Sequence, residues 1–240
     1  MRFDPPDAYW KKDVALFFSR RFALVLKLLY PMAIIVPVAA SGMPAQYAAA
    51  VIGIVAVMAG TFGAGESLTI DLNDGILARV ALTPLSPYRI IFEVLAVNAI
   101  LDLVQLLPAL LIVYLLHPLP LIWMLAATLA VFATLVTANC IGIFIANFTS
   151  SPADVLLYAT AILFPLIYLS GFFRNQHPTG ILQTLRGFVP FSYTDDAMKT
   201  VFGLTTGTTP LEILVYPTIV CAVLAFAVCL TAPRLLSQRP

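Results

Sequence analysis

The sequence predicts an all-α integral membrane protein. Of its 240 residues, 61% are hydrophobic and only 10% are charged, whereas soluble domains carry about 25% charged residues. About six apolar stretches reach the roughly 20 residues that a helix needs to cross a bilayer core. One compact polar insert, residues 69–89, interrupts them. We therefore expect a single transmembrane domain over residues 1–240.

The composition also argues against several functions. A net charge of +1 gives no basic excess for nucleic acid. The three cysteines lie in apolar stretches without metal-ligand spacing, so neither disulfides nor a metal site are expected. The chain lacks the G-x-x-x-x-G-K-[ST] loop that cradles nucleotide phosphates, so we expect it to bind no cofactor itself. The glycine-rich "GTFGAG", Gly60–Gly65, lies in an apolar stretch and is typical of close helix packing.

Residues 1–21 form the first element in chain order. Apolar and basic side chains recur there at helical spacing, which predicts an amphipathic helix in the headgroup plane. Its apolar face would enter lipid, and its bases would extend toward lipid phosphate. The alternative is a simple extension of the first span. The residues expected to carry the interfacial role are Trp10, Lys11, Lys12, Phe17, Arg20 and Arg21.

Six spans follow from the apolar stretches. They are expected at residues 22–40, 46–68, 90–116, 119–146, 153–172 and 211–232. The third and fourth are separated only by "HPLP", His117–Pro120, which predicts a tight turn between antiparallel neighbours. Lys and Arg gather at the ends that are cytoplasmic if the N-terminus is inside, so both termini and the polar insert are expected in the cytoplasm.

The third span carries polar residues on one face. Asn98, Asp102 and Gln105 are spaced four and then three apart. Ionisable groups in a bilayer are costly and usually face a bundle interior or a wet cavity. Two interpretations stay open: a polar gate on a translocation path, or a structural cluster that joins the span to a neighbour, with Lys27 as counter-ion to Asp102.

The polar insert has helix punctuation at both ends. Asn73 or Asp74 can cap a following helix, Ile76–Leu82 provides about two turns, and Pro84 ends them. The pattern predicts a short helix parallel to the membrane, shaped to enter a cleft of another protein. A capped loop with solvated charges is the alternative.

The segment between the last two spans is too polar and too broken by proline and glycine to cross. It is also too apolar for a solvated loop. Irregular backbone at membrane depth is tolerated only where protein buries it. Residues 173–200 are therefore expected to form a pair of short re-entrant helices in the outer leaflet, and we call them the broken segment.

At the polar insert the sequence resembles the ABC-2 type transporter permeases. Their segment after the second span typically reads E-R-E-x-G-T-L-E-R-L-L-x-T-P-L-S, and this chain has "DLNDGILARVALTPLS". It matches at Gly75, Leu77, Arg79, Thr83, Pro84, Leu85 and Ser86. Asp71 stands for the first acid, whereas Leu72 and Asn73 replace the following Arg–Glu pair. The broken segment, together with the residues just before it, is similar to a second family pattern at Gly171, Pro178, Pro190, Tyr193 and Lys199.

The resemblance implies a permease subunit of an ATP-driven ABC exporter in a bacterial cytoplasmic membrane. Two permease copies, identical or related, would join two separate ATP-binding subunits that carry ATP and Mg. The polar insert resembles the coupling helix that sits in a groove of the ATPase. The residues that would carry this coupling are Asn73, Asp74, Gly75, Leu77, Arg79, Leu82, Thr83 and Pro84.

The expected substrate is an amphipathic small molecule, as in drug or antibiotic efflux of anthracycline-like or fluoroquinolone-like compounds. An exporter of a lipid-linked polysaccharide or lipid is the alternative within the family. Outside it, the rivals are an ion-coupled secondary transporter using Asp102 and a non-transport membrane scaffold or enzyme.

Overall fold

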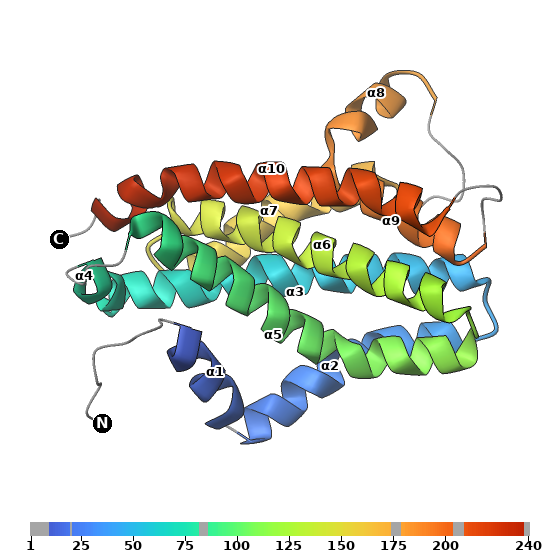
Figure 1. Ribbon diagram of the computed structural model, residues 1–240, viewed down its shortest axis with the longest axis horizontal. Coiled ribbons are helices and arrows are strands. Elements are labelled where there is room, and N and C mark those ends of the chain that lie inside the picture. Colours follow the sequence, from blue (N-terminus) through green and yellow to red (C-terminus); the bar gives the residue numbers. More distant parts are fainter. Residues whose placement is uncertain (1–9, 20, 82–85, 174–178, 204–208, 238–240) are drawn as a thin grey trace.

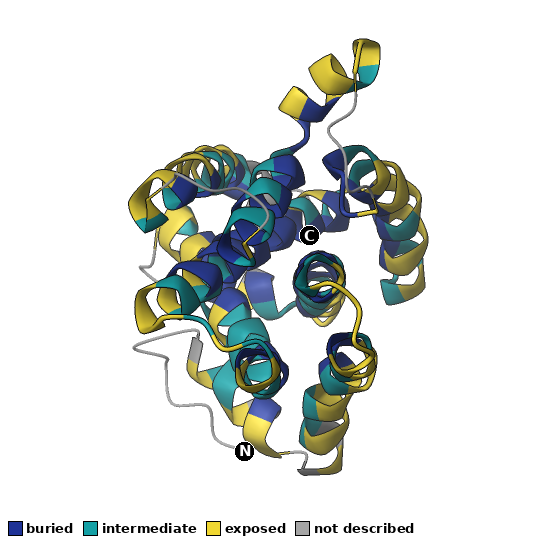
Figure 2. Cartoon of the chain, turned by 90° about the vertical axis from the view of Figure 1, so that its right-hand side faces the viewer, coloured by how far each residue is buried: buried dark blue, intermediate teal, exposed yellow. Residues whose placement is uncertain are grey.

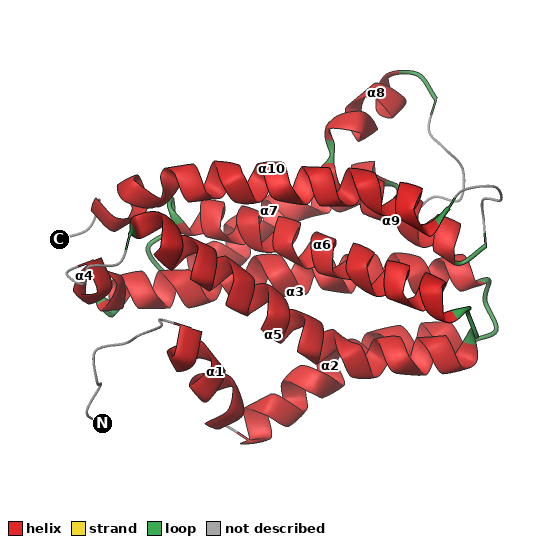
Figure 3. Ribbon diagram, viewed as in Figure 1, coloured by secondary structure: helices red, strands yellow, loops and turns green. Residues whose placement is uncertain are grey.

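The computed structural model describes residues 10–19, 21–81, 86–173, 179–203 and 209–237, and these form a bundle of helices (Figures 1 and 3). No strand occurs among them. The helices in chain order are α1 (Trp10–Ser19), α2 (Arg21–Ala40), α3 (Ala45–Asn73), α4 (Ile76–Ala81), α5 (Pro87–Leu116), α6 (Leu121–Ala146), α7 (Pro152–Ser170), α8 (Ile181–Phe188), α9 (Pro190–Val201) and α10 (Pro210–Ser237).

The expected spans correspond to long helices. Five helices (α3, α5, α6, α7 and α10) are long and apolar enough to cross a membrane. A sixth crossing follows if residues 11–19 and 24–40, which are bent by 81° from each other, are counted as one broken span. The all-α membrane architecture is thereby confirmed.

Local chemistry explains where several of these helices begin. Ser86 accepts a hydrogen bond from the Arg89 amide and precedes Pro87 at the first position of α5, where proline is well tolerated. Ser151 and Asp154 form a reciprocal capping box at the start of α7. The expected turn at His117–Pro120 is present, since α5 ends at Leu116 and α6 begins at Leu121.

The centre of the bundle is the contact between α3 and α6. Both helices are largely buried, whereas little of α10 is buried, and the buried residues gather in the middle of the bundle (Figure 2). The predicted close packing of "GTFGAG" is confirmed. A Cβ on Gly60 would lie 2.9 Å from the Ala138 Cβ, and one on Gly65 would lie 2.7 Å from a Val155 methyl carbon. Only glycine allows the backbones to approach this closely.

The exposed surface of the bundle is strongly apolar. Large hydrophobic side chains such as Leu115, Leu121, Phe164 and Phe226 are more than half exposed. Such an apolar surface is unusual for a soluble monomer and marks contact with lipid or protein. The excess hydrophobicity of the sequence therefore lies on the outside of the bundle.

Candidate functional site

The polar insert begins as a continuation of α3. That helix was expected to end near Leu68, but it runs to Asn73, so the first part of the insert is helical. Gly75 then reverses the chain with φ +64°, a left-handed conformation that glycine adopts at little cost. α4 follows at once and has 6 residues. The predicted turn and short helix are thus both present.

The capping chemistry differs from the expectation. The Asn73 side chain donates to the Ser150 carbonyl oxygen at 2.9 Å, so it holds the insert against the α6–α7 loop. Asp74 occupies the C-cap position of α3. Arg79 reaches back and donates to the Asp74 carbonyl oxygen at 2.9 Å. The last carbonyl groups of a helix lack partners within it. The hydrogen bond from Arg79 therefore stabilises the turn that follows α3.

The side chains of α4 divide between two environments. Leu77 and Val80 are buried in a cluster that includes Ile90 and Val94 of α5. Arg79 is exposed, and so is Asp74 just before the helix. Leu77 therefore anchors the short helix on the bundle, and the polar residues are the ones accessible to another protein. The expected sites Leu82, Thr83 and Pro84 lie outside the described residues.

The N-terminal helix is attached to the polar insert by an ion pair. Lys12 pairs with Asp71 at the end of α3, and its ammonium also lies 3.4 Å from Asp13. The Asp71 carboxylate is 7% exposed, so this pair is shielded from water. Lys12 was expected to extend toward lipid phosphate, and in the structure its charge is compensated by protein. Lys11 is exposed, as expected.

Phe17 was expected to enter lipid, but it is buried in protein at 8% exposure. Lys27 lies over its ring, with the ammonium 5.4 Å from the ring centroid. The side chains of Trp10 and Arg21 and the whole of Arg20 lie outside the described residues. The 81° bend between residues 11–19 and 24–40 agrees with a helix that lies across the bundle, as α1 does in Figure 1.

The polar residues of the third span do not form one network. Asn98 donates to the Val94 carbonyl oxygen of its own helix at 2.9 Å. Asp102 faces Asn139 of α6, whose amide, in the orientation that satisfies both its oxygen and its nitrogen, donates to the carboxylate at 3.2 Å and to the Gly60 carbonyl oxygen at 2.6 Å. Gln105 is partly buried and takes part in neither of these two sets of contacts. This geometry favours the interpretation of Asp102 as a structural link among α3, α5 and α6.

Lys27 is not the close counter-ion of Asp102. It forms the cation–π contact with Phe17 and adds only a longer-range attraction to the carboxylate. Asn139, which is completely buried, is the partner that the sequence did not reveal. It lies on the next helix, and no short-range spacing connects it with Asp102.

The broken segment contains the expected pair of short helices, α8 and α9. α9 packs within the bundle against α6 and α10, whereas α8 projects from it (Figures 1 and 2). Pro190 opens α9, and Gly171 ends α7 with φ +103°. Tyr193 donates to the Gly187 carbonyl oxygen at 2.9 Å and joins the two helices. Pro178 lies outside the described residues.

A buried ionic cluster connects α7, α8 and α9. Arg186 donates to the Ser170 carbonyl oxygen at 2.9 Å and to Asp195 at 3.0 Å. Lys199 donates to the same Asp195 carboxylate at 2.7 Å and to the Gly171 carbonyl oxygen at 3.0 Å. Burial raises the pKa of the Asp195 carboxyl, and Lys199 and Arg186 oppose that rise. The cluster therefore fixes the broken segment to the end of α7.

The sequence prediction found Gly171 and Lys199 through the family pattern but missed Arg186, Asp195 and Asp196. One local signal was available. Asp195 and Lys199 are four residues apart, which is the spacing of an ion pair on a helix. The contacts of Arg186 join different helices and have no such signal.

The long apolar helices, the lipid-compatible surface and the short helix at one end of the bundle define a multi-pass membrane protein. The ABC-2 type transporter family model matches residues 8–203 of this chain. The chain therefore belongs to the ABC-2 type transporter family and is a transport subunit. Comparison with curated proteins finds no match.

Proposed function

We propose that this chain is the permease of a bacterial exporter and that its polar insert takes up movement from a separate ATP-binding subunit. The observation that carries the proposal is the two-sided arrangement of α4. Leu77 and Val80 hold it on the bundle, whereas Asp74 and Arg79 remain exposed. A force applied to the exposed side would thus be transmitted to α3 and α5, which flank the insert.

The ion pair between Lys12 and Asp71 extends this linkage. It connects α1 to the last turn of α3, directly before the insert. Movement of the insert would therefore also shift α1. This supports a role for α1 beside the membrane surface, with the N-terminus on the same side as α4.

We propose a complex of two permeases, identical or related, with two ATP-binding subunits that hold ATP and Mg. Both chain termini would lie in the cytoplasm and the broken segment in the outer leaflet of the cytoplasmic membrane. In support, α4 and the end of α10 lie at the same end of the bundle, where Leu77 shares a core cluster with Val228 and Ala232 (Figure 1).

The substrate that we propose is an amphipathic small molecule, with drug or antibiotic efflux as the biological role. The third span supports this choice because the carboxylate near its middle, Asp102, is hydrogen-bonded to Asn139, and its other carboxylate, Glu93, is paired with Arg89. Because the Asp102 carboxylate is engaged in joining helices, few charged groups remain in the span to carry an ion along a coupled path. An amphipathic compound matches a path that is otherwise apolar.

The test uses the permease co-purified with its ATP-binding subunit. Residues 75–83 are replaced by a flexible Gly/Ser linker of the same length. We expect the subunits to separate, or ATP hydrolysis to become independent of the permease. A second variant, Asp74→Ala with Arg79→Ala, alters only exposed side chains, and we expect it to weaken association about tenfold. Unchanged association and hydrolysis in both folded variants would refute the proposal.

A further inference from the structure

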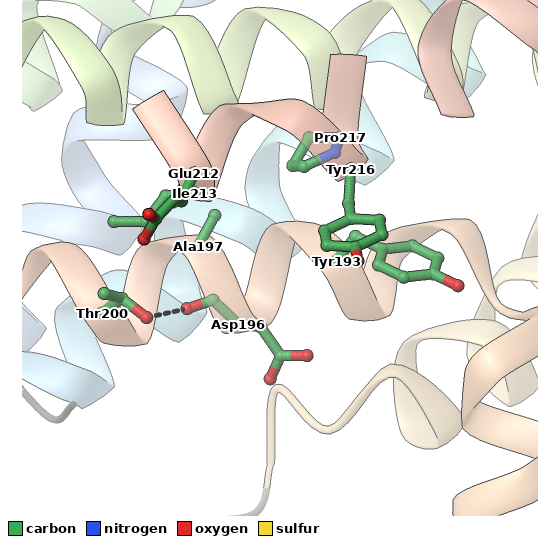
Figure 4. A pocket seen from close by; sticks show the side chains of 8 residues that line it. All are labelled: Tyr193, Asp196, Ala197, Thr200, Glu212, Ile213, Tyr216 and Pro217. Carbon is green, nitrogen blue, oxygen red and sulfur yellow. Dashed lines mark hydrogen bonds between the residues drawn. The ribbon is translucent and has the colours of Figure 1, made fainter. Parts of the chain in front are cut away.

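We propose that a cavity between α9 and α10 binds a hydrophobic organic cation. The cavity has a volume of about 360 Å³, which lies within the range of small-molecule sites. It is separate from the polar insert. Its lining residues, drawn in Figure 4, are Tyr193, Asp196, Ala197, Thr200, Glu212, Ile213, Tyr216 and Pro217.

Two stacked tyrosines form one end of this cavity. The rings of Tyr193 and Tyr216 lie 5.8 Å apart and 17° from parallel (Figure 4). Tyr193 is fixed by its hydrogen bond to the Gly187 carbonyl oxygen, whereas Tyr216 is 63% exposed. The electron-rich faces of aromatic rings attract cations, most strongly organic cations that shed water easily. The pair therefore provides a preformed aromatic wall.

The charges around the cavity favour a cation. Its lining among the described residues includes two carboxylates, Asp196 and Glu212, and no Lys or Arg. Asp196 is paired with Arg186. Glu212 accepts a hydrogen bond from the Thr209 amide at 3.1 Å, but among the described residues it has no ion pair and it is exposed. Glu212 is therefore the charge that a bound cation would complement.

The neighbouring ionic cluster does not cancel this charge. Within the part of the chain that the structure describes, Asp195 and Asp196 form ion pairs with the two nearby cations, Arg186 and Lys199. Adding Glu212 gives three acids against two bases among the described residues, so this part of the described chain carries an excess negative charge. An anion would be repelled here.

The rest of the lining determines how polar the ligand is. Ala197, Ile213 and Pro217 present apolar surface, and Ile213 is buried at 9% exposure. A small hydrated ion would gain nothing from these contacts, whereas a hydrophobic cation would use both the apolar floor and the tyrosines. The geometry therefore points to a lipophilic cation. This inference rests on the proposed export of amphipathic molecules and narrows that class to cations.

The test measures equilibrium binding to the full-length permease in nanodiscs of neutral lipid, without an ATP-binding subunit. The probe is tetraphenylphosphonium, and tetraphenylborate is an anion of the same shape. Isothermal titration calorimetry, corrected with empty nanodiscs, gives both affinities. We expect the cation to bind about fivefold more tightly than the anion, because an exposed pair of opposite charges contributes up to about this factor.

Two pairs of variants locate the site. Glu212→Gln keeps the capping geometry at the start of α10, and it should weaken binding of the cation about threefold. Its control is Glu66→Gln, an exposed acid in α3. Tyr216→Ala should also weaken binding about threefold, and its control is Tyr88→Ala, with an exposed tyrosine in α5. Both controls should bind as wild type does.

Weaker binding in Glu212→Gln and Tyr216→Ala but not in the controls would support the site. Equal affinity for both probes, or wild-type affinity in both cavity variants, would overturn it. Because the assay contains no ATPase, failure of the coupling experiment would leave this result unaffected. Failure here would likewise leave the assignment of the polar insert intact.

Discussion

Glycines set the distance between the two central helices. A Cβ on Gly142 of α6 would overlap the Thr61 carbonyl oxygen of α3 and lie 3.0 Å from the Gly65 amide nitrogen. Small residues at such crossings allow dispersion contacts between the backbones themselves. Thr61 adds a hydrogen bond to the Ala138 carbonyl oxygen at 3.2 Å. The crossing therefore has little room for larger side chains.

Gly142→Ala is expected to lower the free energy of unfolding by about 1–3 kcal/mol, because the added methyl group forces the helices apart. Thermal unfolding of the purified protein measures the change. Gly187→Ala is the matched control, since its Cβ would meet no atom within 4 Å. Equal unfolding temperatures for both variants would contradict the proposed close contact.

Arg186 is the residue on which the ionic cluster depends most. Arg186→Gln leaves the carboxylate of Asp195, which is 1% exposed, with Lys199 as its remaining cation. We expect a loss of about 3 kcal/mol in unfolding free energy, as for other broken buried ion pairs.

The control for that variant is Arg89→Gln. Arg89 is 56% exposed in its pair with Glu93, so its loss should cost less than about 0.5 kcal/mol. Adding Asp195→Asn to Arg186→Gln should recover part of the stability. If the two arginine variants unfold alike, the cluster does not hold the broken segment.

At the scale of elements, the link between α1 and α3 determines how firmly the N-terminal helix is held. Lys12→Gln removes a shielded charge pair with Asp71. Charged hydrogen bonds contribute about 1.5–3 kcal/mol, so amides of α1 should exchange with deuterium about tenfold faster. Lys11→Gln alters a neighbouring exposed lysine and should change nothing. Equal exchange in both variants would show that the pair does not hold α1.

The elements that could be predicted from the sequence are those with local signals. Apolar stretches gave the long helices, and Gly75 and the prolines gave the turn and the short helix in the polar insert. The Lys12–Asp71 contact could not be predicted, because 59 residues separate its partners and each charge alone resembles a solvated one. The extension of α3 to Asn73 was missed because Thr69 and Asp71 are polar residues of the kind found in loops. In the structure both are buried.

At the scale of the whole molecule, a single end of the bundle carries the features of the proposed exporter that face the cytoplasm. The polar insert, the Lys12–Asp71 pair and the end of α10 lie there. The cavity between α9 and α10 is lined in part by the broken segment itself, and α9 lies away from α4 in the bundle (Figure 1). Energy input and ligand binding would thus occur on opposite sides of the membrane.

The central claim is that the polar insert faces the cytoplasm. Asp74→Cys, in a background without the three native cysteines, is treated with a membrane-impermeant thiol reagent in intact cells and after permeabilisation. Thr184→Cys on the exposed side of α8 is the counterpart. We expect Asp74→Cys to react only after permeabilisation and Thr184→Cys to react in intact cells. Labelling of Asp74→Cys in intact cells would contradict the account.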